Sequence, residues 1–215
     1  AKGLVQRDVI RVVTPGTVIE SGMLDERSNN FLLSVCFSGE KAGLAFADVS
    51  TGEFFVHQVE DAGRTLADEV TRISPVEIIA SDLVRLREYV NRDDLSMSER
   101  PGTTFQYQNA SETLCKHFHL QDLSPLGLTD EYRLAAQAAG ALMRYLDETQ
   151  KNALEHITEL RIYQGGDTML LDRNTRRNLE LTESLRSRTK KGSLLWLMDK
   201  TSTAMGGRLL RSWIE

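Results

Sequence analysis

The chain has 215 residues, of which 40% are hydrophobic and 27% charged, and its formal net charge at pH 7 is −5. This length provides for one large domain or two small ones, and the composition suffices for a packed core. No apolar run approaches the roughly 18–20 residues needed to cross a bilayer, no signal peptide is recognisable, and the two cysteines (Cys36 and Cys115) provide no disulfide framework, so we expect a reduced, cytoplasmic protein.

Runs of apolar and β-branched residues in the first part of the chain predict a β-sheet. A β-branched run over 9–13 leads into the turn Thr14-Pro15-Gly16. Apolar runs over 31–37, 43–49 and 53–59 predict three strands, and a Gly-containing link predicts that the last two form a hairpin. These runs are apolar almost throughout, which favours a sheet that is covered on both faces.

The hydrophobic period then alternates between helix and strand. We expect a helix over 62–73, which Ser74-Pro75 ends, a short strand over 76–80, and a second helix that Ser81 or Asp82 caps. Short extended pieces follow in the polar stretch 91–108, and then a helix over 110–118. The predicted order is β-β-β-α-β-α-β-α, a mixed α/β domain.

Ser124-Pro125-Leu126-Gly127 predicts the boundary between an α/β domain (1–127) and an all-α domain (128–215). The first carries 12 basic and 19 acidic residues and the second 14 and 12, which indicates two modules with different surfaces. A long helix from about 130 to 149 opens the second module. It is slim, because alanines and Gly140 fill its centre, so a neighbouring helix could approach closely.

The last segment predicts an amphipathic helix with Ser202 or Thr203 as its N-cap. Its apolar stripe reaches the last residue without a stop signal, so we expect either a piece of a longer chain or a partner surface elsewhere in this one. The expected partner for Met205, Leu209 and Trp213 is the helix over 134–145.

Asp48 is the residue that most suggests chemistry. It ends an apolar strand before Ser50-Thr51-Gly52, where a carboxylate can hold a divalent metal for phosphodiester hydrolysis if other carboxylates converge on it. The further aspartates at loop or helix-start positions are Asp61, Asp68, Asp82 and Asp93. The alternative role for Asp48 is to accept hydrogen bonds from the turn that follows it.

Metal, nucleophile and nucleotide motifs are weak or missing in the printed sequence. Cys115 and His119 share one helical face with His117 between them, but Cys36, His57 and His156 are scattered, so we expect no zinc site. No defensible Ser/His/Asp arrangement and no G-x-x-x-x-G-K-[ST] motif occurs. Lys191-Gly192-Ser193 has the wrong order, and Gly206-Gly207 lies inside a helix pattern and predicts close helix packing.

A basic cluster occupies the second module. Its members are Arg173, Arg176, Arg177, Arg186, Arg188, Lys190 and Lys191. Arg176 has i, i+4 partners in Asp172 and Glu180, whereas the run 186–191 is unbalanced. Arg186, Arg188, Lys190 and Lys191 are therefore candidate phosphate contacts, although without neighbouring aromatic residues base stacking is not suggested and a solvated loop is the alternative.

Landmarks spread along the chain resemble, in family order, the MutS family of DNA mismatch repair proteins. They are Arg11 to Thr17, Gly43 to Phe54, Ala138 to Leu142 with Thr149 to Lys151, Leu171 to Leu181, Leu194 to Thr203, and Met205 to Arg211. One departure is Ala204, where the family usually has proline.

By this resemblance, residues 1–127 are the connector domain, with a ribonuclease-H-like fold that lacks nuclease activity, and residues 128–215 are the first part of the helical core, or lever, domain. The lesion-reading domain would precede this piece, and the clamp and the ATPase domain, with ATP and Mg²⁺, would follow it. The resemblance implies no catalytic, cofactor or metal residue here. The parent, a homodimer, would recognise mispaired or unpaired bases in double-stranded DNA.

The resemblance also implies a partner surface. The connector would transmit conformational change and present a surface to MutL, which in this sequence corresponds to the helix around Glu112 and Thr113. The alternative function is a metal-dependent, ribonuclease-H-like nuclease centred on Asp48. A third hypothesis is nucleic-acid binding through 186–191.

Overall fold

The computed structural model describes residues 12–18, 29–150, 154–163, 171 and 173–214. The strands in this part of the chain are β1 (Leu32–Ser38), β2 (Lys41–Asp48), β3 (Glu53–Val59), β4 (Glu77–Ala80), β5 (Ser96–Glu99) and β6 (Arg161–Ile162). The helices are α1 (Ala62–Ile73), α2 (Leu83–Tyr89), α3 (Tyr107–Phe118), α4 (Arg133–Gln150), α5 (Arg173–Asn178), α6 (Leu194–Met198) and α7 (Ala204–Ile214). The predicted order β-β-β-α-β-α-β-α is confirmed as far as α3.

All six strands form one mixed sheet in the order β5-β4-β1-β2-β3-β6. β2 runs antiparallel to both of its neighbours, whereas β1 with β4, β4 with β5, and β3 with β6 pair in parallel. The predicted hairpin between the second and third strands is confirmed, and Gly52 adopts a φ of 77° in its turn, a conformation that favours glycine.

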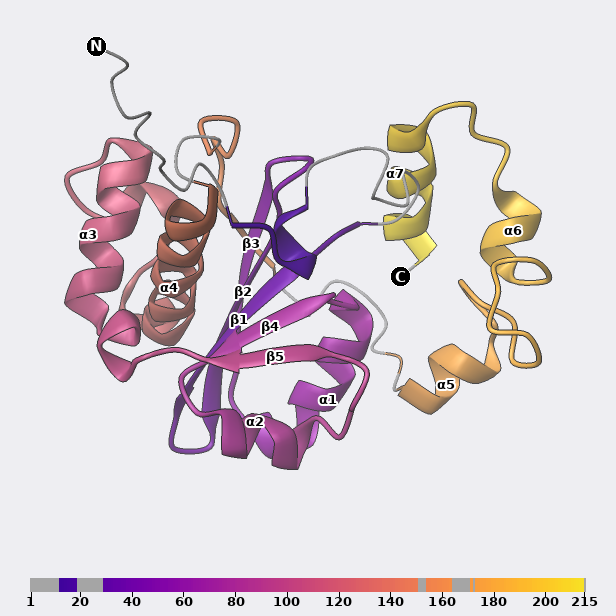
Figure 1. Cartoon of the computed structure of the whole chain (residues 1–215), viewed down its shortest axis with the longest axis horizontal. Coiled ribbons are helices and arrows are strands. Elements are labelled where there is room, and N and C mark those ends of the chain that lie inside the picture. Colours follow the sequence, from indigo (N-terminus) through magenta and orange to yellow (C-terminus); the bar gives the residue numbers. More distant parts are fainter. Residues whose placement is uncertain (1–11, 19–28, 151–153, 164–170, 172, 215) are drawn as a thin grey trace, which may run out of the picture.

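Helices cover the sheet on both faces, as the apolar strands predicted. α1 and α2 lie on one face, and α3 and α4 on the other (Figure 1). The alternation of β1 shows the division, because Leu32 belongs to the core under α4 and Leu33 to the core under α1. Both leucines are fully buried.

Aspartate side chains cap the N-termini of helices α1 and α2. The Asp61 carboxylate accepts the N–H of Arg64, and the Asp82 carboxylate accepts the N–H of Arg85. The structure begins and ends α1 where the sequence predicted, and Ser74 ends it in the left-handed conformation before the proline.

The long helix α4 approaches both the sheet and α3 very closely. A Cβ atom added to Gly43 of β2 would lie 2.1 Å from the Leu134 backbone, and one added to Gly140 would lie 2.3 Å from the Ala110 Cα. Both contacts are shorter than van der Waals distance, so only glycine permits this spacing. The expectation that a helix could approach α4 closely is confirmed, and that helix is α3.

The hydrophobic core beneath α4 continues across the predicted domain boundary at Gly127, and the boundary itself stays a prediction. Leu123 and Leu128, on either side of Gly127, belong to the same hydrophobic core, which also includes Leu142 of α4 and Leu160 before β6. A slim apolar stripe packs on any apolar surface of suitable shape, and here the sheet and α3 provide it.

A buried carboxylate anchors the segment before β1. Oε2 of Glu77 accepts hydrogen bonds from the Thr14 hydroxyl (2.6 Å) and the Gly16 N–H (2.9 Å), and Oε1 accepts one from the Tyr145 hydroxyl (2.7 Å). Pro15–Thr17 form a 3-10 turn there. Of the β-branched run over 9–13, residues 9–11 lie outside the described residues, and Val12 and Val13 are exposed and not in a strand.

Helices α5, α6 and α7 form a looser second unit beside the sheet (Figure 1). Among described residues 173–214, only Ser193, Leu195 and Gly207 are buried. α5 lies against α1, and α6 contacts α7.

The expected docking of α7 on α4 is wrong. Trp213 is 75% exposed, and Met205 and Leu209 are also exposed. The stripe of α4 is already covered, and α7 instead turns its small residue Gly207 and the neighbouring Arg208 inward. Thr203 caps α7 as predicted, because its hydroxyl accepts the Gly206 N–H at 3.1 Å.

Candidate functional site

Asp48 is fully buried at the end of β2 and organises the turn that follows it. Its Oδ1 accepts the N–H of Ser50 at 2.8 Å and the Ser50 hydroxyl at 2.6 Å. Its Oδ2 accepts the N–H of Asn30 at 2.8 Å. The turn-stabilising role considered for this residue is thus confirmed.

Arg208 of α7 reaches the same carboxylate from the second unit. Its Nη1 lies 3.9 Å from Asp48 Oδ2 and donates a 3.2 Å hydrogen bond to the Ser50 hydroxyl. The Arg208 side chain is only 11% exposed. The Arg208 guanidinium thus places a positive charge beside Asp48, and its hydrogen bond to Ser50 joins two residues that are 158 positions apart.

The other candidate carboxylates lie at or within α1, at the start of α2 or in the loop before β5. Asp61 and Asp82 are the helix caps described above, Asp68 lies within α1, and Asp93 lies in the loop before β5. In the ranges that the structure describes, no group of three His, Cys, Asp or Glu side chains is arranged to hold a metal ion.

The cysteine and histidine residues have structural partners. A ring nitrogen of His117 lies 2.8 Å from the Ile157 carbonyl, and His119 ends α3 in the left-handed conformation. His57 and His156 similarly contact the carbonyls of Tyr163 and Val49, respectively. Cys36 is buried in the sheet, where burial raises its pKa to about 11, although a hydrogen bond with Ser81 acts in the opposite direction.

The proposed partner surface on α3 lies on the outer side of that helix. Glu112 is exposed, and Thr113 is half-buried with its hydroxyl donating to the Asn109 carbonyl. Thr113 also lines a groove of about 570 Å³, together with Lys116 and His117 of α3, Asp147 of α4 and the segment 154–158.

The four candidate phosphate contacts do not form one cluster. Lys190 pairs with Asp199, and this contact lowers the pKa of the Asp199 carboxyl. Arg186 and Lys191 are exposed on the loop, and Arg188 lines a cleft that faces the first unit. We expected Arg176 to pair with Asp172 and Glu180. Asp172 lies outside the described residues. The Glu180 carboxylate accepts the N–H of Leu185 at 2.6 Å.

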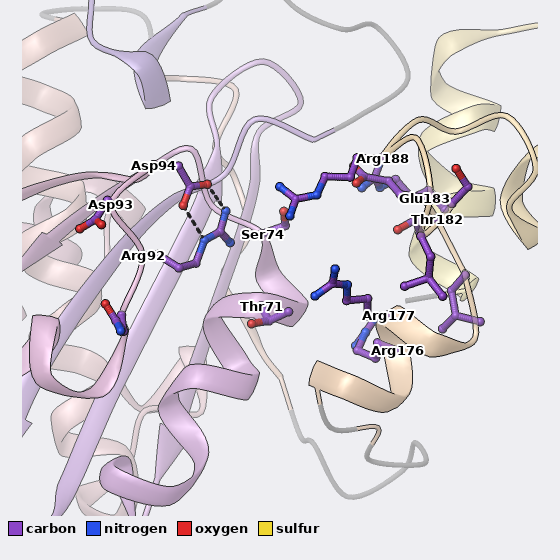
Figure 2. Close-up of a pocket in the computed structure, with 15 residues that line it drawn as sticks. Thr71, Ser74, Arg92, Asp93, Asp94, Arg176, Arg177, Thr182, Glu183 and Arg188 are labelled. Carbon is purple, nitrogen blue, oxygen red and sulfur yellow. Dashed lines mark hydrogen bonds and ion pairs between the residues drawn. The ribbon is translucent and has the colours of Figure 1, made fainter.

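That cleft, of about 680 Å³, lies between the two units (Figure 2). The first unit contributes Thr71, Ser74 and residues 91–94, and the second unit contributes residues from α5, the following loop and α7. This cleft could not be identified from the sequence, because its arginines come from separate segments. The contact of Arg208 was also not predicted, although Gly206-Gly207, which predicted close helix packing, stands next to it in the sequence.

These observations define the class of protein to which the chain belongs, namely a mixed α/β unit joined to a loosely packed helical unit. The family model for MutS domain II matches residues 30–158, and that for MutS domain III matches residues 174–215. The chain therefore belongs to the MutS family of DNA mismatch repair proteins.

Individual relatives support the same conclusion. The chain is 46% identical over 222 residues to the DNA mismatch repair protein MutS of Ruminiclostridium cellulolyticum and 46% identical over 221 residues to that of Symbiobacterium thermophilum. It is 45% identical over 215 residues to that of Dehalococcoides mccartyi strain ATCC BAA-2266. These alignments cover 99–100% of the chain but only 24–25% of each relative, so the chain spans about a quarter of the length of the relatives it matches.

Within the described residues, no helix has the length and apolarity that a membrane span requires.

Proposed function

We propose that this chain is the part of a MutS protein that transmits conformational change between the lesion-reading and ATPase ends of its parent and presents a surface to MutL. The parent recognises mispaired or unpaired bases in double-stranded DNA, acts as a homodimer in the cytoplasm, and uses ATP and Mg²⁺. The piece itself has no catalytic role.

The observation that carries this proposal is the contact between the two family domains within one chain. Domain II ends its β2 strand at Asp48, and domain III contributes Arg208 to the same turn. Together with the packing of α5 against α1, a polar contact between the two units is a means by which the position of one unit can bias the position of the other.

We further propose that the first unit is a ribonuclease-H-like connector. The supporting feature is the order β3-β2-β1-β4-β5, in which β2 alone runs against the other strands. The division into connector (1–127) and lever (128–215) stays a prediction, and α4, which packs on the sheet, would then move with the connector.

The MutL surface is assigned to the outer side of α3, on the opposite face of the sheet from α1 and α2. Exposed charge on a helix bordering a groove supports a polar rim around a partly apolar contact. Glu112→Lys and Thr113→Lys should each weaken capture of MutL by the immobilised 215-residue chain by roughly tenfold, because either change places a new cation in that contact.

Glu88→Lys is the matched control for this pull-down. Glu88 is exposed on α2, and its substitution makes the same charge change on the other face of the sheet. MutL capture that falls equally in Glu88→Lys and Glu112→Lys would contradict the assignment to α3.

The alternative function, a nuclease centred on Asp48, is tested separately. Cleavage of DNA or RNA by the purified chain with Mg²⁺ or Mn²⁺, abolished in Asp48→Asn, would overturn the non-catalytic role. The bonds of Asp48 argue against that outcome, because both its oxygens already accept hydrogen bonds from the protein.

A further inference from the structure

We propose that the cleft between the two units binds a small ligand that carries phosphate groups, held by the guanidinium groups of Arg177 and Arg188. This site goes beyond the proposed function, which assigns no ligand to the chain itself. Its volume of about 680 Å³ falls in the range of small-molecule sites, and such sites often lie between domains.

The side chains of Arg177 and Arg188 extend from the second unit toward Thr71 and Ser74 at the end of α1 (Figure 2). They come from different segments, α5 and the loop that follows it. Two planar guanidinium groups that approach one space from two segments suit a tetrahedral anion, because each can donate two parallel hydrogen bonds.

The charges around the cleft favour an anion. Its lining holds five arginines and three carboxylates: Arg92, Arg176, Arg177, Arg188 and Arg211, with Asp93, Asp94 and Glu183. Arg92 and Asp94 neutralise each other through a bidentate contact, which Figure 2 marks. Arg177 and Arg188 form no ion pair with any residue in the described part of the chain, although the charge of Arg188 interacts at longer range with the Asp94 carboxylate, which Arg92 already binds.

The backbone holds Arg188 in an unfavourable conformation. Its φ is 50°, in the left-handed region, which costs conformational energy for a residue other than glycine. Two backbone hydrogen bonds of 2.9 Å, Arg188 N–H to Ser184 O and Ser184 N–H to Thr189 O, fix this turn. Hydrogen bonds from the Ser187 hydroxyl to the hydroxyls of Ser184 (2.6 Å) and Thr189 (2.8 Å), in either direction, stabilise the turn further. A turn secured in this way holds the start of the Arg188 side chain at the cleft before any ligand arrives.

The concave shape favours a small polyphosphate over duplex DNA. A duplex spreads its phosphates along the length of a rigid cylinder, so it binds to an extended basic groove or strip rather than to a pocket of this size. Arg186 and Lys191 lie on the exposed loop outside the cleft lining and so are not assigned to this site.

The test is calorimetric titration of the 215-residue chain with inorganic tripolyphosphate at low salt. We expect binding that Arg177→Gln and Arg188→Gln each weaken about tenfold, and a nucleoside triphosphate should compete for the same site. Absence of tripolyphosphate binding by the unmodified chain would overturn the proposal, as would tripolyphosphate binding that Arg177→Gln and Arg188→Gln both leave unchanged.

Arg186→Gln is the matched control, since it removes one charge from the same loop outside the cleft. An equal weakening in this variant would mean general charge attraction and would contradict the site. Arg188→Lys keeps the charge but loses the planar fork, so it should weaken binding less than Arg188→Gln does. Unchanged circular dichroism and melting temperature would show that each variant is folded.

Discussion

The guanidinium of Arg208 lies 3.9 Å from the fully buried carboxylate of Asp48, and Arg208 donates a hydrogen bond to the Ser50 hydroxyl, which itself donates to that carboxylate. A residue of α7 thereby completes a hydrogen-bonded turn that begins at the end of β2. Both side chains are nearly or fully excluded from water, so salt screens their interaction less than it screens an exposed pair.

Arg208→Gln should lower the free energy of unfolding by about 1–2 kcal/mol. The loss is smaller than for a typical buried pair, because Asp48 keeps its three hydrogen bonds to Asn30 and Ser50. Urea denaturation followed by circular dichroism measures the change. Arg186→Gln, at an exposed position, is the control and should change stability by less than about 0.5 kcal/mol. Equal effects of the two substitutions would show that the contact contributes nothing.

Gly140→Ala should destabilise the protein even though alanine is the better helix former. The new methyl group would lie 2.3 Å from the Ala110 Cα, so α3 and α4 would have to move apart. We expect a loss of about 1–3 kcal/mol, the usual cost of overpacking, which outweighs the gain in helix propensity of up to about 1 kcal/mol. Thermal unfolding measures the difference.

Gly63→Ala is the matched control for that substitution. Gly63 is also helical, but a Cβ there would meet its nearest neighbour, Tyr89, at an ordinary 3.6 Å. Stability should stay the same or rise by a few tenths of a kcal/mol. A stabilising Gly140→Ala would contradict the close approach of α3 to α4.

Tyr145 should make stability depend on pH in alkaline solution. Burial raises the pKa of Tyr145 to about 12, and its hydrogen bond to Glu77 acts in the same direction. In the unfolded chain the pKa is about 10. The folded state thus holds this proton more tightly, so the contribution to stability is complete below pH 10 and is lost as pH rises toward about 12.

Tyr145→Phe lacks this titration. At neutral pH it should cost about 1–3 kcal/mol, because Oε1 of buried Glu77 loses the hydrogen bond from the tyrosine hydroxyl. The difference from the unmodified chain should shrink between pH 10 and 12, which denaturation at the two pH values measures. A constant difference would mean that the Tyr145 pKa is not raised.

Cys36 should be nearly inert toward thiol reagents while the protein is folded. It is 4% exposed, and its pKa of about 11 leaves very little thiolate at pH 8, whereas Cys115 is half-buried. In a Cys115→Ser variant, we expect alkylation of the remaining thiol to be at least roughly a hundredfold slower than in denaturant. Rapid alkylation of that folded variant would show that the sheet opens around β1.

Much of the first unit could be predicted from the sequence. The strands follow from apolar runs, and α1 was predicted with its observed limits because its apolar residues recur at helical spacing and Ser74-Pro75 stop it. The structure adds Asp61 as its N-cap, which was not predicted from the sequence. β6 could not be predicted, since Arg161–Ile162 carries no periodicity and becomes a strand only by pairing with β3.

Helix partners were harder to predict than the helices themselves. The stripes of α4 and α7 were both recognised, but an apolar stripe does not specify its partner. α4 packs on the sheet because Gly43 and Gly140 permit close approach, a constraint of shape that periodicity does not report. For the candidate site, the position of Asp48 suggested either a metal or a turn, and only the positions of Asn30 and Ser50 decided between them.

The uneven burial along the chain implies a gradient of local opening. β1 and β2 lie between two cores, so their amide hydrogens should exchange with solvent only when the whole unit unfolds. Within described residues 173–214, only Ser193, Leu195 and Gly207 are buried, so local opening there exposes little apolar surface and costs little. The helical unit can therefore fluctuate while the sheet stays intact, which is the mechanical behaviour that the proposed transmission role requires.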